Sequence, residues 1–247
     1  MQPSLPQSLH DRRRAPTASE LAGIPWLHVL QPDERERAVA TISVGDARPG
    51  DFVCRIGRPV TYWFGVIEGL LKMSTDSEQG QHVTFTGVPP GGWFGEGTAL
   101  KREAYRYNIQ PLRNSVVAGL PVDTFHWLLD HSIGFNRFVM NQLNERLAQF
   151  IAAREIDRLA NPDVRVARSL AALFNPVLYP GVGEVLRITQ QELAYLVGLS
   201  RQRVNEALSV LQEQGAIRVE YGGLRVLDLA ALRTNAGTAR QRAAAVA

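Results

Sequence analysis

Three side chains that each carry several hydrogen-bonding groups stand close together in the C-terminal part of the chain. Arg201, Gln202 and Asn205 lie in the first two turns of a segment with helical periodicity. A guanidinium group matches the guanine edge in the major groove of DNA, and a glutamine or asparagine amide matches adenine. This combination indicates a helix that reads base pairs.

The segment around these residues has the spacing of a helix-turn-helix. Thr189 and Glu192 form the T-x-x-E pattern of a capping box, which starts a first helix. Gly198 permits the positive φ of a tight turn, and Ser200 caps a second helix. The residues expected to face inward are Leu193, Ala194 and Val197 in the first helix and Val204, Leu208 and Leu211 in the second. An ordinary helical hairpin with a polar outer face is the alternative, but the cap, the glycine turn and the outward polar set coincide, which favours DNA binding.

A β-hairpin is expected directly after the second helix. The β-prone runs 217–220 and 224–227 are joined through Gly222-Gly223, a strong turn signal. Such a hairpin is typical of a wing that lies against the phosphate backbone. Arg218 and Arg225 are candidates for phosphate contacts, although exposed arginines on a solvated hairpin are equally expected. The predicted DNA contacts are Thr189, Gln190, Ser200, Arg201, Gln202, Arg203, Asn205 and Arg218.

Length and composition limit the possible classes of protein. The 247 residues suffice for two domains that each bury a core. No apolar run approaches the ~18 residues of a membrane span, and the N-terminus lacks the apolar segment of a secretory signal. We therefore expect a cytoplasmic protein that has no contact with a membrane.

Enzymatic and metal-dependent functions find little support. Cys54 is the only cysteine, which rules out a disulfide within the chain, a cysteine-ligated zinc site and an iron–sulfur cluster. The chain has no H-E-x-x-H, P-loop or G-x-S-x-G motif. The sequence thus predicts a protein that is not an enzyme and binds no metal.

The charge is distributed unevenly along the chain. From Asn161 onward there are ten arginines, no lysine and seven acidic residues, an excess of three positive charges, whereas residues 1–160 hold seventeen of each sign. The excess therefore lies in the segment with the helix-turn-helix, where a polyanionic partner would bind. It is small and only supports the motif.

The N-terminal two thirds of the chain have the pattern of a small β-domain followed by a long helix. Short β-prone runs, separated by glycine and proline at spacings near ten residues, lie at 51–55, 62–67, 70–74, 82–86, 105–110 and 115–120. They predict a small sandwich, roll or barrel, flanked by helices at 32–40 and 122–130. Asn161-Pro162, an N-cap with a proline at the first helical position, begins a further helix and marks a hinge.

A helix is expected over 134–159, with an apolar stripe along one side. The stripe consists of Phe135, Val139, Leu143, Leu147, Phe150 and Ile151. A stripe of this length requires a partner surface. A coiled-coil-like contact in a homodimer is one candidate, and packing on the chain's own β-domain is the other.

Order and motifs together resemble the cyclic AMP receptor protein/FNR family of bacterial transcription regulators. The resemblance spans about Ile42 to Arg233. It is carried by the segments VIEG at 66–69, GWFGE at 92–96, Arg106, Arg146-Leu147 and ITQQELAYLVGLSRQRV at 188–204. It implies an α+β fold with an N-terminal β-roll, a long dimerisation helix and a C-terminal winged helix-turn-helix.

From the resemblance and the residue patterns we expect five segments. They are a disordered arm (1–20), a β-roll effector domain (21–131), the dimerisation helix with its hinge (132–160), the DNA-binding domain (161–233) and a disordered tail (234–247). The resemblance also implies a homodimer that binds an inverted-repeat operator on double-stranded DNA and contacts RNA polymerase. The two-fold axis of such a dimer spaces its recognition helices by about one turn of DNA, ~34 Å.

The effector site departs from the pattern of the members that bind cyclic AMP. In those proteins a Gly-Glu pair holds the ribose and an Arg-Ser or Arg-Thr pair holds the phosphate, whereas here Gly95-Glu96 and Arg106 match but Tyr107 follows the arginine. Two small hydroxyl residues of the long helix read the adenine, and Phe150 and Ile151 stand at those positions. Each unreplaced polar contact costs about 1–3 kcal/mol, which argues against cyclic AMP as a tight effector.

Several effectors therefore stay open for the candidate site formed by Gly95, Glu96, Arg106, Tyr107, Arg146, Phe150 and Ile151. Cyclic di-GMP could place its phosphates on the arginines and stack on the aromatic rings. An apolar effector is a second possibility. A third possibility is a pocket filled by side chains, which gives a regulator without a ligand. The plain structural role of Arg106 and Glu96 is an internal ion pair with each other. No haem or iron–sulfur cofactor is expected, because neither a cysteine cluster nor a Cys or His beside Gly95-Glu96 is present.

The recognition helix also departs from the family's best-known member. That member contacts DNA through an Arg-Glu pair and a second arginine four residues after the glutamate. Here Arg201, Gln202 and Glu206 occupy the three positions, so the half-site should differ from TGTGA at one or two base pairs. A nucleotide-sensing module that does not touch DNA would explain the β-roll but leave the helix-turn-helix and the wing unexplained.

Overall fold

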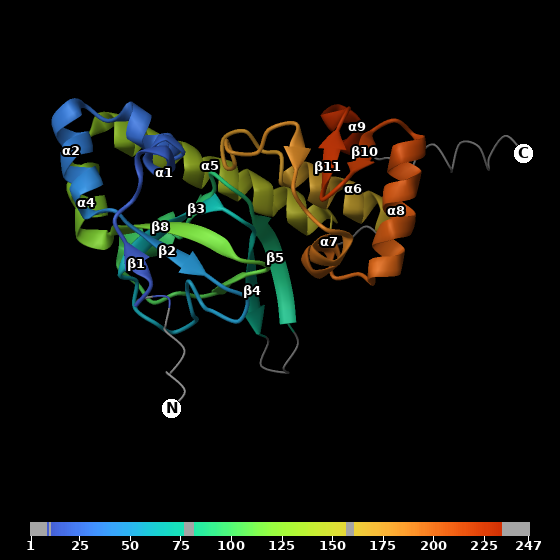
Figure 1. Ribbon diagram of the computed structural model, residues 1–247, viewed down its shortest axis with the longest axis horizontal. Coiled ribbons are helices and arrows are strands. Elements are labelled where there is room, and N and C mark those ends of the chain that lie inside the picture. The colour runs from blue at the N-terminus through green and yellow to red at the C-terminus, as the bar shows by residue number, and fades with distance from the viewer. Residues whose placement is uncertain (1–8, 10, 77–81, 157–160, 234–247) are drawn as a thin grey trace, which may run out of the picture. The chain divides into compact units, whose positions relative to one another are not determined.

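The computed structural model describes residues 9, 11–76, 82–156 and 161–233. These residues form two compact units (Figure 1). The first contains the chain up to Asn144 together with Val177–Gly181, and the second contains the rest. The expected tail at 234–247 lies outside the described residues.

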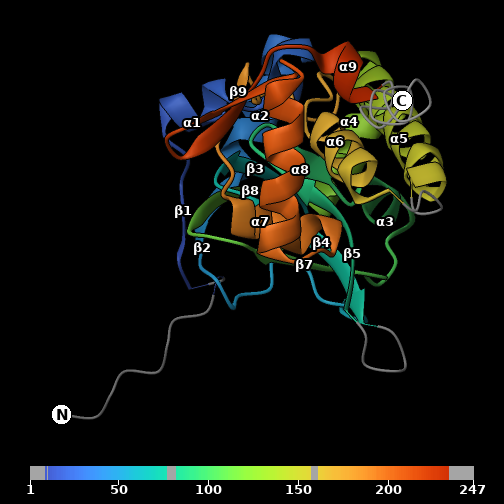
Figure 2. The same ribbon diagram turned by 90° about the vertical axis from the view of Figure 1, so that its right-hand side faces the viewer.

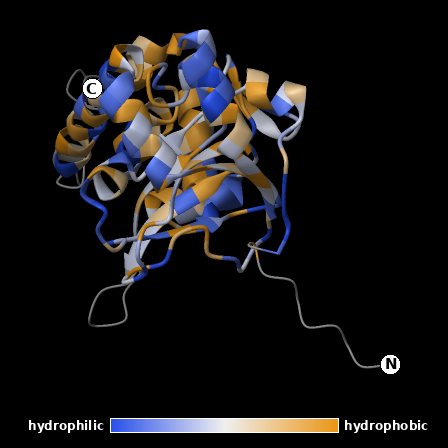
Figure 3. Cartoon of the chain, turned by 90° about the vertical axis from the view of Figure 1, so that its left-hand side faces the viewer, coloured by the Kyte–Doolittle hydropathy of each residue, from blue (hydrophilic) through white to orange (hydrophobic). Residues whose placement is uncertain are grey.

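The first unit combines two antiparallel sheets with short helices. Its helices are α1 (Ala18–Ala22), a 3-10 helix η1 (Pro25–Val29), α2 (Pro32–Thr41), α3 (Glu96–Lys101), α4 (Val122–His131) and the N-terminal half of α5 (Ile133–Ile156). Its strands are β1 (Arg13–Arg14), β2 (Ser43–Ala47), β3 (Tyr62–Glu68), β4 (Leu71–Asp76), β5 (His82–Val88), β6 (Trp93–Phe94), β7 (Asn108–Pro111) and β8 (Ser115–Pro121). Hydrophobic and hydrophilic stretches lie side by side on the helix ribbons, as expected for helices that cover a core on one face (Figure 3).

Strands distant in the sequence pair to form the roll. Within the described part of the chain, one sheet has the order β1-β2-β8-β3-β6 and the other has the order β5-β4-β7. All pairs are antiparallel, and β8 lies between β2 and β3, with Val117 opposite both Gly45 and Val66. The predicted β-roll is thereby confirmed.

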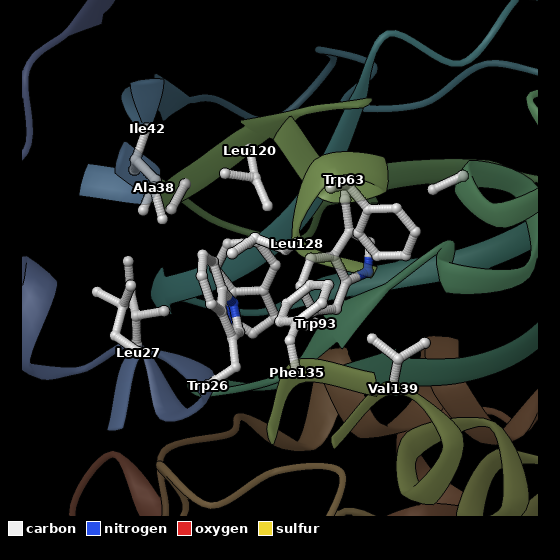
Figure 4. Close-up of a cluster of buried hydrophobic side chains, with 14 of the residues drawn as sticks. Trp26, Leu27, Ala38, Ile42, Trp63, Trp93, Leu120, Leu128, Phe135 and Val139 are labelled. Carbon is white, nitrogen blue, oxygen red and sulfur yellow. The ribbon is translucent and has the colours of Figure 1, made fainter. Parts of the chain in front are cut away.

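An aromatic cluster forms the centre of the first unit (Figure 4). Trp26, Trp63, Trp93, Phe125 and Phe135 are at most 1% exposed and come from η1, β3, β6, α4 and α5. The rings of Trp63 and Trp93 are 4.5 Å apart, and Trp26 meets Trp93 edge to face at 5.2 Å. Such aromatic pairs contribute about 0.5–1.5 kcal/mol each beyond the area they bury. The cluster fixes β6, which leads into Gly95.

The long helix α5 carries two apolar rows rather than the single predicted stripe. Phe135 and Val139 are buried in the aromatic core of the first unit, so this part of the stripe packs on the chain's own roll. A second row is exposed by 61–72% and consists of Ile133, Met140, Leu147 and Ile151. The first row packs on the chain's own roll, and the second row faces solvent in the single chain.

The second unit is built around the predicted helix-turn-helix (Figure 2). Besides the C-terminal half of α5 it contains α6 (Pro162–Ala172), β9 (Val185–Leu186), α7 (Gln190–Val197), α8 (Arg201–Glu213), β10 (Ile217–Glu220), β11 (Gly223–Val226) and α9 (Leu229–Arg233). β10, β11 and β9 form an antiparallel sheet, and α6 packs against α7, α8 and α9. As predicted, Asn161 caps α6 with its side chain and Pro162 is the first helical residue.

Several expectations about element bounds are wrong. The arm 1–20 is not disordered throughout, because Arg13–Arg14 pair with β2 and Arg12 forms an ion pair with Asp51. The run 51–55 forms only an isolated bridge, from Cys54 to Ile109, and no strand. The boundary between units falls within α5 rather than at 160, and Val177–Gly181 belongs to the first unit, where Tyr179 packs against Gly92. No helix in the described part of the chain has the length and apolar character needed to cross a membrane.

Candidate nucleic-acid interface and effector cradle

Local hydrogen bonds fix both helices of the helix-turn-helix. The Thr189 hydroxyl accepts from the Glu192 amide at 3.1 Å, and the Glu192 carboxylate accepts from the Thr189 amide at 2.7 Å, which completes the capping box. Gly198 has φ of +65°, and the Ser200 hydroxyl accepts from the amide of Arg203 at 3.2 Å. The six apolar residues expected to face inward are all buried. The predicted motif is confirmed in its caps, its turn and its core.

The first two turns of α8 present polar groups to solvent. Arg201, Gln202 and Asn205 are exposed, as is Glu206. The side chain of Gln190, at the start of α7, donates to the Asn205 Oδ1 atom at 2.8 Å and so connects the two helices. Gln202 donates to Glu206 Oε1 at 3.3 Å. This surface offers a guanidinium group and three amides, the groups that hydrogen-bond to base edges.

Arg203 differs from its neighbours on α8. Its side chain is 30% exposed, and its Nη2 atom lies 2.6 Å from Asp163 Oδ1 in the first turn of α6. Its Nη1 atom lies 3.4 Å from Glu206 Oε2. Arg203 is one of the predicted DNA contacts, but its guanidinium group is held between two carboxylates.

The two arginines of the wing differ in their surroundings. Arg218 and Arg225 are opposite each other in the β10–β11 ladder. Arg225 forms ion pairs with Glu220 at 2.6 Å and Glu184 at 2.7 Å, and these carboxylates raise its pKa. Arg218 is exposed, and Tyr221 at the tip of the hairpin is fully exposed. Of the two arginines, Arg218 is the better candidate for a phosphate contact.

The candidate effector cradle lies at the end of β6. Gly95 has φ of +83°, a left-handed conformation that favours glycine, and Glu96 begins α3 with 2% of its surface exposed. A methyl group added to Gly95 would lie 3.3 Å from the hydroxyl oxygen of Tyr107. The Tyr107 hydroxyl therefore lies close to the backbone of Gly95.

Arg106 points away from this cradle. Its side chain is 78% exposed, and it pairs with Glu103 at 3.0 Å rather than with Glu96. The ion pair between Arg106 and Glu96 that the sequence allowed is therefore wrong. Arg146, Phe150 and Ile151 belong to the second unit, in the C-terminal half of α5, where Arg146 is buried, Phe150 is half-buried and Ile151 is 64% exposed.

Two buried side chains, Tyr105 and Cys54, lie close to the cradle. Tyr105 packs beside Gly95, and its hydroxyl donates to the backbone oxygen of Tyr62 at 2.9 Å. Cys54 is 1% exposed, and burial raises the pKa of its thiol well above the ordinary value. No group of three or more histidine, cysteine or acidic side chains suited to a metal ion occurs among the residues that the structure describes.

Known proteins match both units. The model of the cyclic nucleotide-binding domain matches residues 28–132, and that of the Crp-like helix-turn-helix domain matches residues 164–234. The transcriptional regulator SdrP of Thermus thermophilus is 32% identical over 174 residues, which cover 69% of this chain and 81% of SdrP. The chain belongs to the CRP/FNR family of transcription regulators.

A further relative and a solved structure are also similar to this chain. The cAMP-activated global transcriptional regulator CRP of Haemophilus influenzae is 26% identical over 170 residues, or 65% of this chain and 73% of that protein. The structure of FixK2 from Bradyrhizobium japonicum covers 78% of this chain and 96% of its own at 14% identity, with a TM-score of 0.62. The predicted family and fold class are confirmed.

Within this CRP/FNR fold, the sequence did not reveal the partners of the exposed residues. No local pattern indicates a partner for Asp163, whose ion pair with Arg203 joins residues forty positions apart. The spacing of Arg203 and Glu206, three residues apart on a helix, is a signal that could have predicted their contact. The bond between Gln190 and Asn205 requires the angle between α7 and α8, which no local pattern gives.

Proposed function

We propose that this CRP/FNR regulator binds a specific inverted-repeat operator as a homodimer and that its target differs from TGTGA at one or two base pairs. The observation that carries the proposal is the start of α8, where Arg201, Gln202 and Asn205 are exposed on a firmly capped helix. Docked in the major groove, these groups meet base edges while Arg218 meets the phosphate backbone. Thr189, Gln190 and Ser200 border the same surface at the helix starts, where backbone N–H groups favour phosphate.

The partners follow from the same proposal. A regulator of this kind acts in the cytoplasm, where it meets DNA, and influences transcription through RNA polymerase. Its role is regulatory rather than enzymatic. A gel-shift series with genomic fragments tests the central claim: one fragment should be retained far more strongly than its neighbours. Equal retention of all fragments, or of none, favours a nucleotide-sensing module that does not read DNA.

The exposed row on α5 supports the homodimer. Ile133, Met140 and Leu147 are seven residues apart, and Ile151 follows after four, which is the spacing of a coiled-coil seam. Large apolar side chains that are 61–72% exposed are stabilised when a second copy covers them. A two-fold contact of this kind presents the same row on both copies.

Aspartate at two positions of the row tests the dimer. Leu147→Asp with Ile151→Asp should convert the protein to a monomer in sedimentation at micromolar concentration. Operator affinity should fall at least ~100-fold, because the two half-sites then bind independently. Asn141→Asp, at an exposed position about 100° around the helix from Met140, is the matched control and should leave both measurements unchanged. A monomeric wild type that binds the operator with undiminished affinity would contradict the homodimer.

The cradle does not fit cyclic AMP. Tyr107 covers Gly95, and Arg106, the expected phosphate clamp, extends into solvent beside Glu103. Phe150 and Ile151 offer no hydrogen bonds to a purine. Although the Haemophilus influenzae relative is cAMP-activated, these substitutions argue that this chain answers to another effector or to none. The position of Tyr107 beside Gly95 favours a regulator without an effector, which binds DNA without a ligand because its own side chains fill the cradle.

Calorimetry separates these possibilities. Cyclic AMP should bind with a dissociation constant above ~100 μM, equivalent to an affinity of only about 5.5 kcal/mol. The triple variant Tyr107→Ser, Phe150→Thr, Ile151→Ser should bind it more tightly. Titration with cyclic di-GMP distinguishes a larger nucleotide from a filled cradle, and loss of its binding in Arg106→Ala would show that the exposed guanidinium group turns from Glu103 to a phosphate. Low-micromolar binding of cyclic AMP to the unmodified protein, with a matching rise in operator affinity, would refute this part of the proposal.

A further inference from the structure

A chain of four side chains runs from α6 to the exposed face of the recognition helix. Asp163 in the first turn of α6 accepts from Arg203, Arg203 donates to Glu206, and Glu206 accepts from Gln202. The heavy-atom distances are 2.6, 3.4 and 3.3 Å in that order. The last member, Gln202, is one of the residues expected to read a base.

The fixed end of this chain is Asp163. The residue is 8% exposed, and its backbone amide donates to the N-cap side chain of Asn161 at 2.9 Å. The bond to Asn161 holds the backbone of Asp163 at the start of α6, where the helix dipole favours a carboxylate. A buried charge of this kind requires a partner, and Arg203 provides it.

The geometry of Arg203 suits a bridge better than a DNA contact. One nitrogen of its planar fork meets Asp163 and another meets Glu206, so both ends of the guanidinium group already have a carboxylate partner. An arginine held between two carboxylates attracts phosphate less than an exposed one does. Arg201, by comparison, is exposed at the start of the same helix.

Glu206 gives the bridge its second role. A carboxylate on a surface that faces DNA is repelled by the phosphates unless a cation neutralises it. Arg203 supplies that cation and holds Oε2, which leaves Oε1 to accept from the Gln202 amide. The orientation of Gln202 on the base-reading face is therefore coupled to the position of α6.

We propose that Arg203 is a positioning residue that ties the recognition helix to Asp163 and, through Glu206, orients Gln202 for base recognition. This inference rests on the proposed function and deepens it. It reassigns Arg203 from a direct DNA contact to a residue that acts through others. The specificity at one base pair then depends on two acidic residues that touch no base.

The decisive variants change the bridge in graded steps. Arg203→Lys keeps the positive charge but cannot span both carboxylates, Arg203→Met removes the charge, and Asp163→Asn removes the fixed end with little change of shape. Glu206→Gln changes only the exposed end, so it keeps the fold even where a change at the buried pair does not. Arg218→Ala serves as the phosphate-contact control. Each full-length variant is measured for operator affinity, affinity for random DNA, salt dependence, binding-site selection and unfolding temperature.

We expect Arg203→Lys and Arg203→Met to lower operator affinity ~10-fold. Arg203→Lys keeps the charge beside Glu206 and should leave both random-DNA affinity and its salt slope unchanged, whereas Arg203→Met should also lower random-DNA affinity, because Glu206 then repels the phosphates. Base preference should relax at the pair read by Gln202, and Glu206→Gln should relax it there without changing the unfolding temperature. In an Asp163→Asn background the Arg203→Met change should have little further effect, because residues of one network are not additive.

Three results would overturn the inference. The first is an unchanged base preference in Glu206→Gln. The second is an Arg203→Lys variant that binds the operator like the wild type. The third is a fall of about one in the salt slope when Arg203→Met is made together with Glu206→Gln, a charge-balanced change that would mark a direct phosphate contact as in Arg218→Ala. Failure of the proposed function looks different, since the wild type itself would then select no DNA sequence.

Discussion

Two regions of this protein match the same family's motifs but present their side chains differently. In the helix-turn-helix, Arg201 and Gln202 are exposed at the start of a capped helix. In the cradle, Gly95 and Arg106 match the family's motif by position. The Tyr107 hydroxyl, however, lies close to Gly95, and the Arg106 side chain is 78% exposed and pairs with Glu103. A motif thus predicts the position of a backbone segment more securely than the use of its side chains.

The physical reason lies in where each motif obtains its order. The recognition helix is oriented by caps, a left-handed glycine and an apolar face, all within thirty residues of sequence. The cradle is assembled from β6, α3 and the loop before β7, so the side chain that follows Arg106 decides what occupies it. Here that residue is Tyr107, whose hydroxyl oxygen would lie 3.3 Å from a methyl group added to Gly95.

Matched alanine substitutions of the motif arginines should give the largest difference between the two regions. Arg201→Ala should weaken operator binding by about 1–3 kcal/mol, or ~5- to 150-fold, and relax selection for one G·C pair. Arg106→Ala should change operator binding by less than about twofold in the absence of a ligand, because an exposed ion pair contributes little. Fluorescence anisotropy with the selected operator measures both.

The predictions for Arg201→Ala and Arg106→Ala can be contradicted independently. An Arg201→Ala variant that binds like the wild type would show that the recognition helix is misplaced. An Arg106→Ala variant that loses operator binding would show that the cradle arginine acts in the DNA-binding state, and the difference between the regions would then disappear.

Each of the two regions contains a glycine with a positive φ, Gly95 in the cradle and Gly198 in the turn, and the cost of replacing each one extends the comparison to stability. Gly198→Ala should cost about 1–2 kcal/mol of unfolding free energy from backbone strain alone, because no other atom lies within 4 Å of the added methyl group. Gly95→Ala should cost more, since its methyl group also meets the Tyr107 hydroxyl. Chemical denaturation with urea measures both changes.

Tyr107→Phe is the control for this difference. Removal of the hydroxyl should reduce the extra cost at Gly95 and leave the cost at Gly198 unchanged. Equal costs at the two glycines in the wild-type background would mean that Tyr107 does not occupy the cradle in solution.

The smallest expected effect compares the two wing arginines. Arg218→Ala should weaken binding to all DNA sequences to a similar extent and reduce the salt slope by about one. Arg225→Ala should leave the slope unchanged, because Glu184 and Glu220 already neutralise that charge. Binding isotherms at several salt concentrations test both variants, and an equal loss of slope in the two would show that the ion pairs of Arg225 open on DNA.

The sequence by itself determined the features whose causes are local. The capping box at Thr189, the turn at Gly198 and the wing at 217–226 depend on residues a few positions apart, so their spacing sufficed to predict them. The β-roll was also predictable as a class, because regular turns separate its strands. The ends of its strands were not, as the run 51–55 shows, since partners more than fifty residues away decide them.

Only the tertiary structure decided which side chains are available. The predicted apolar stripe of α5 divides, because the aromatic core buries Phe135 and Val139 while Leu147 and Ile151 remain exposed. The Arg203 side chain pairs with a carboxylate of the same unit, because Asp163, forty residues earlier, lies beside it. Helical periodicity gives the direction of a side chain from its own axis, but the neighbour it meets depends on long-range packing that no local spacing encodes.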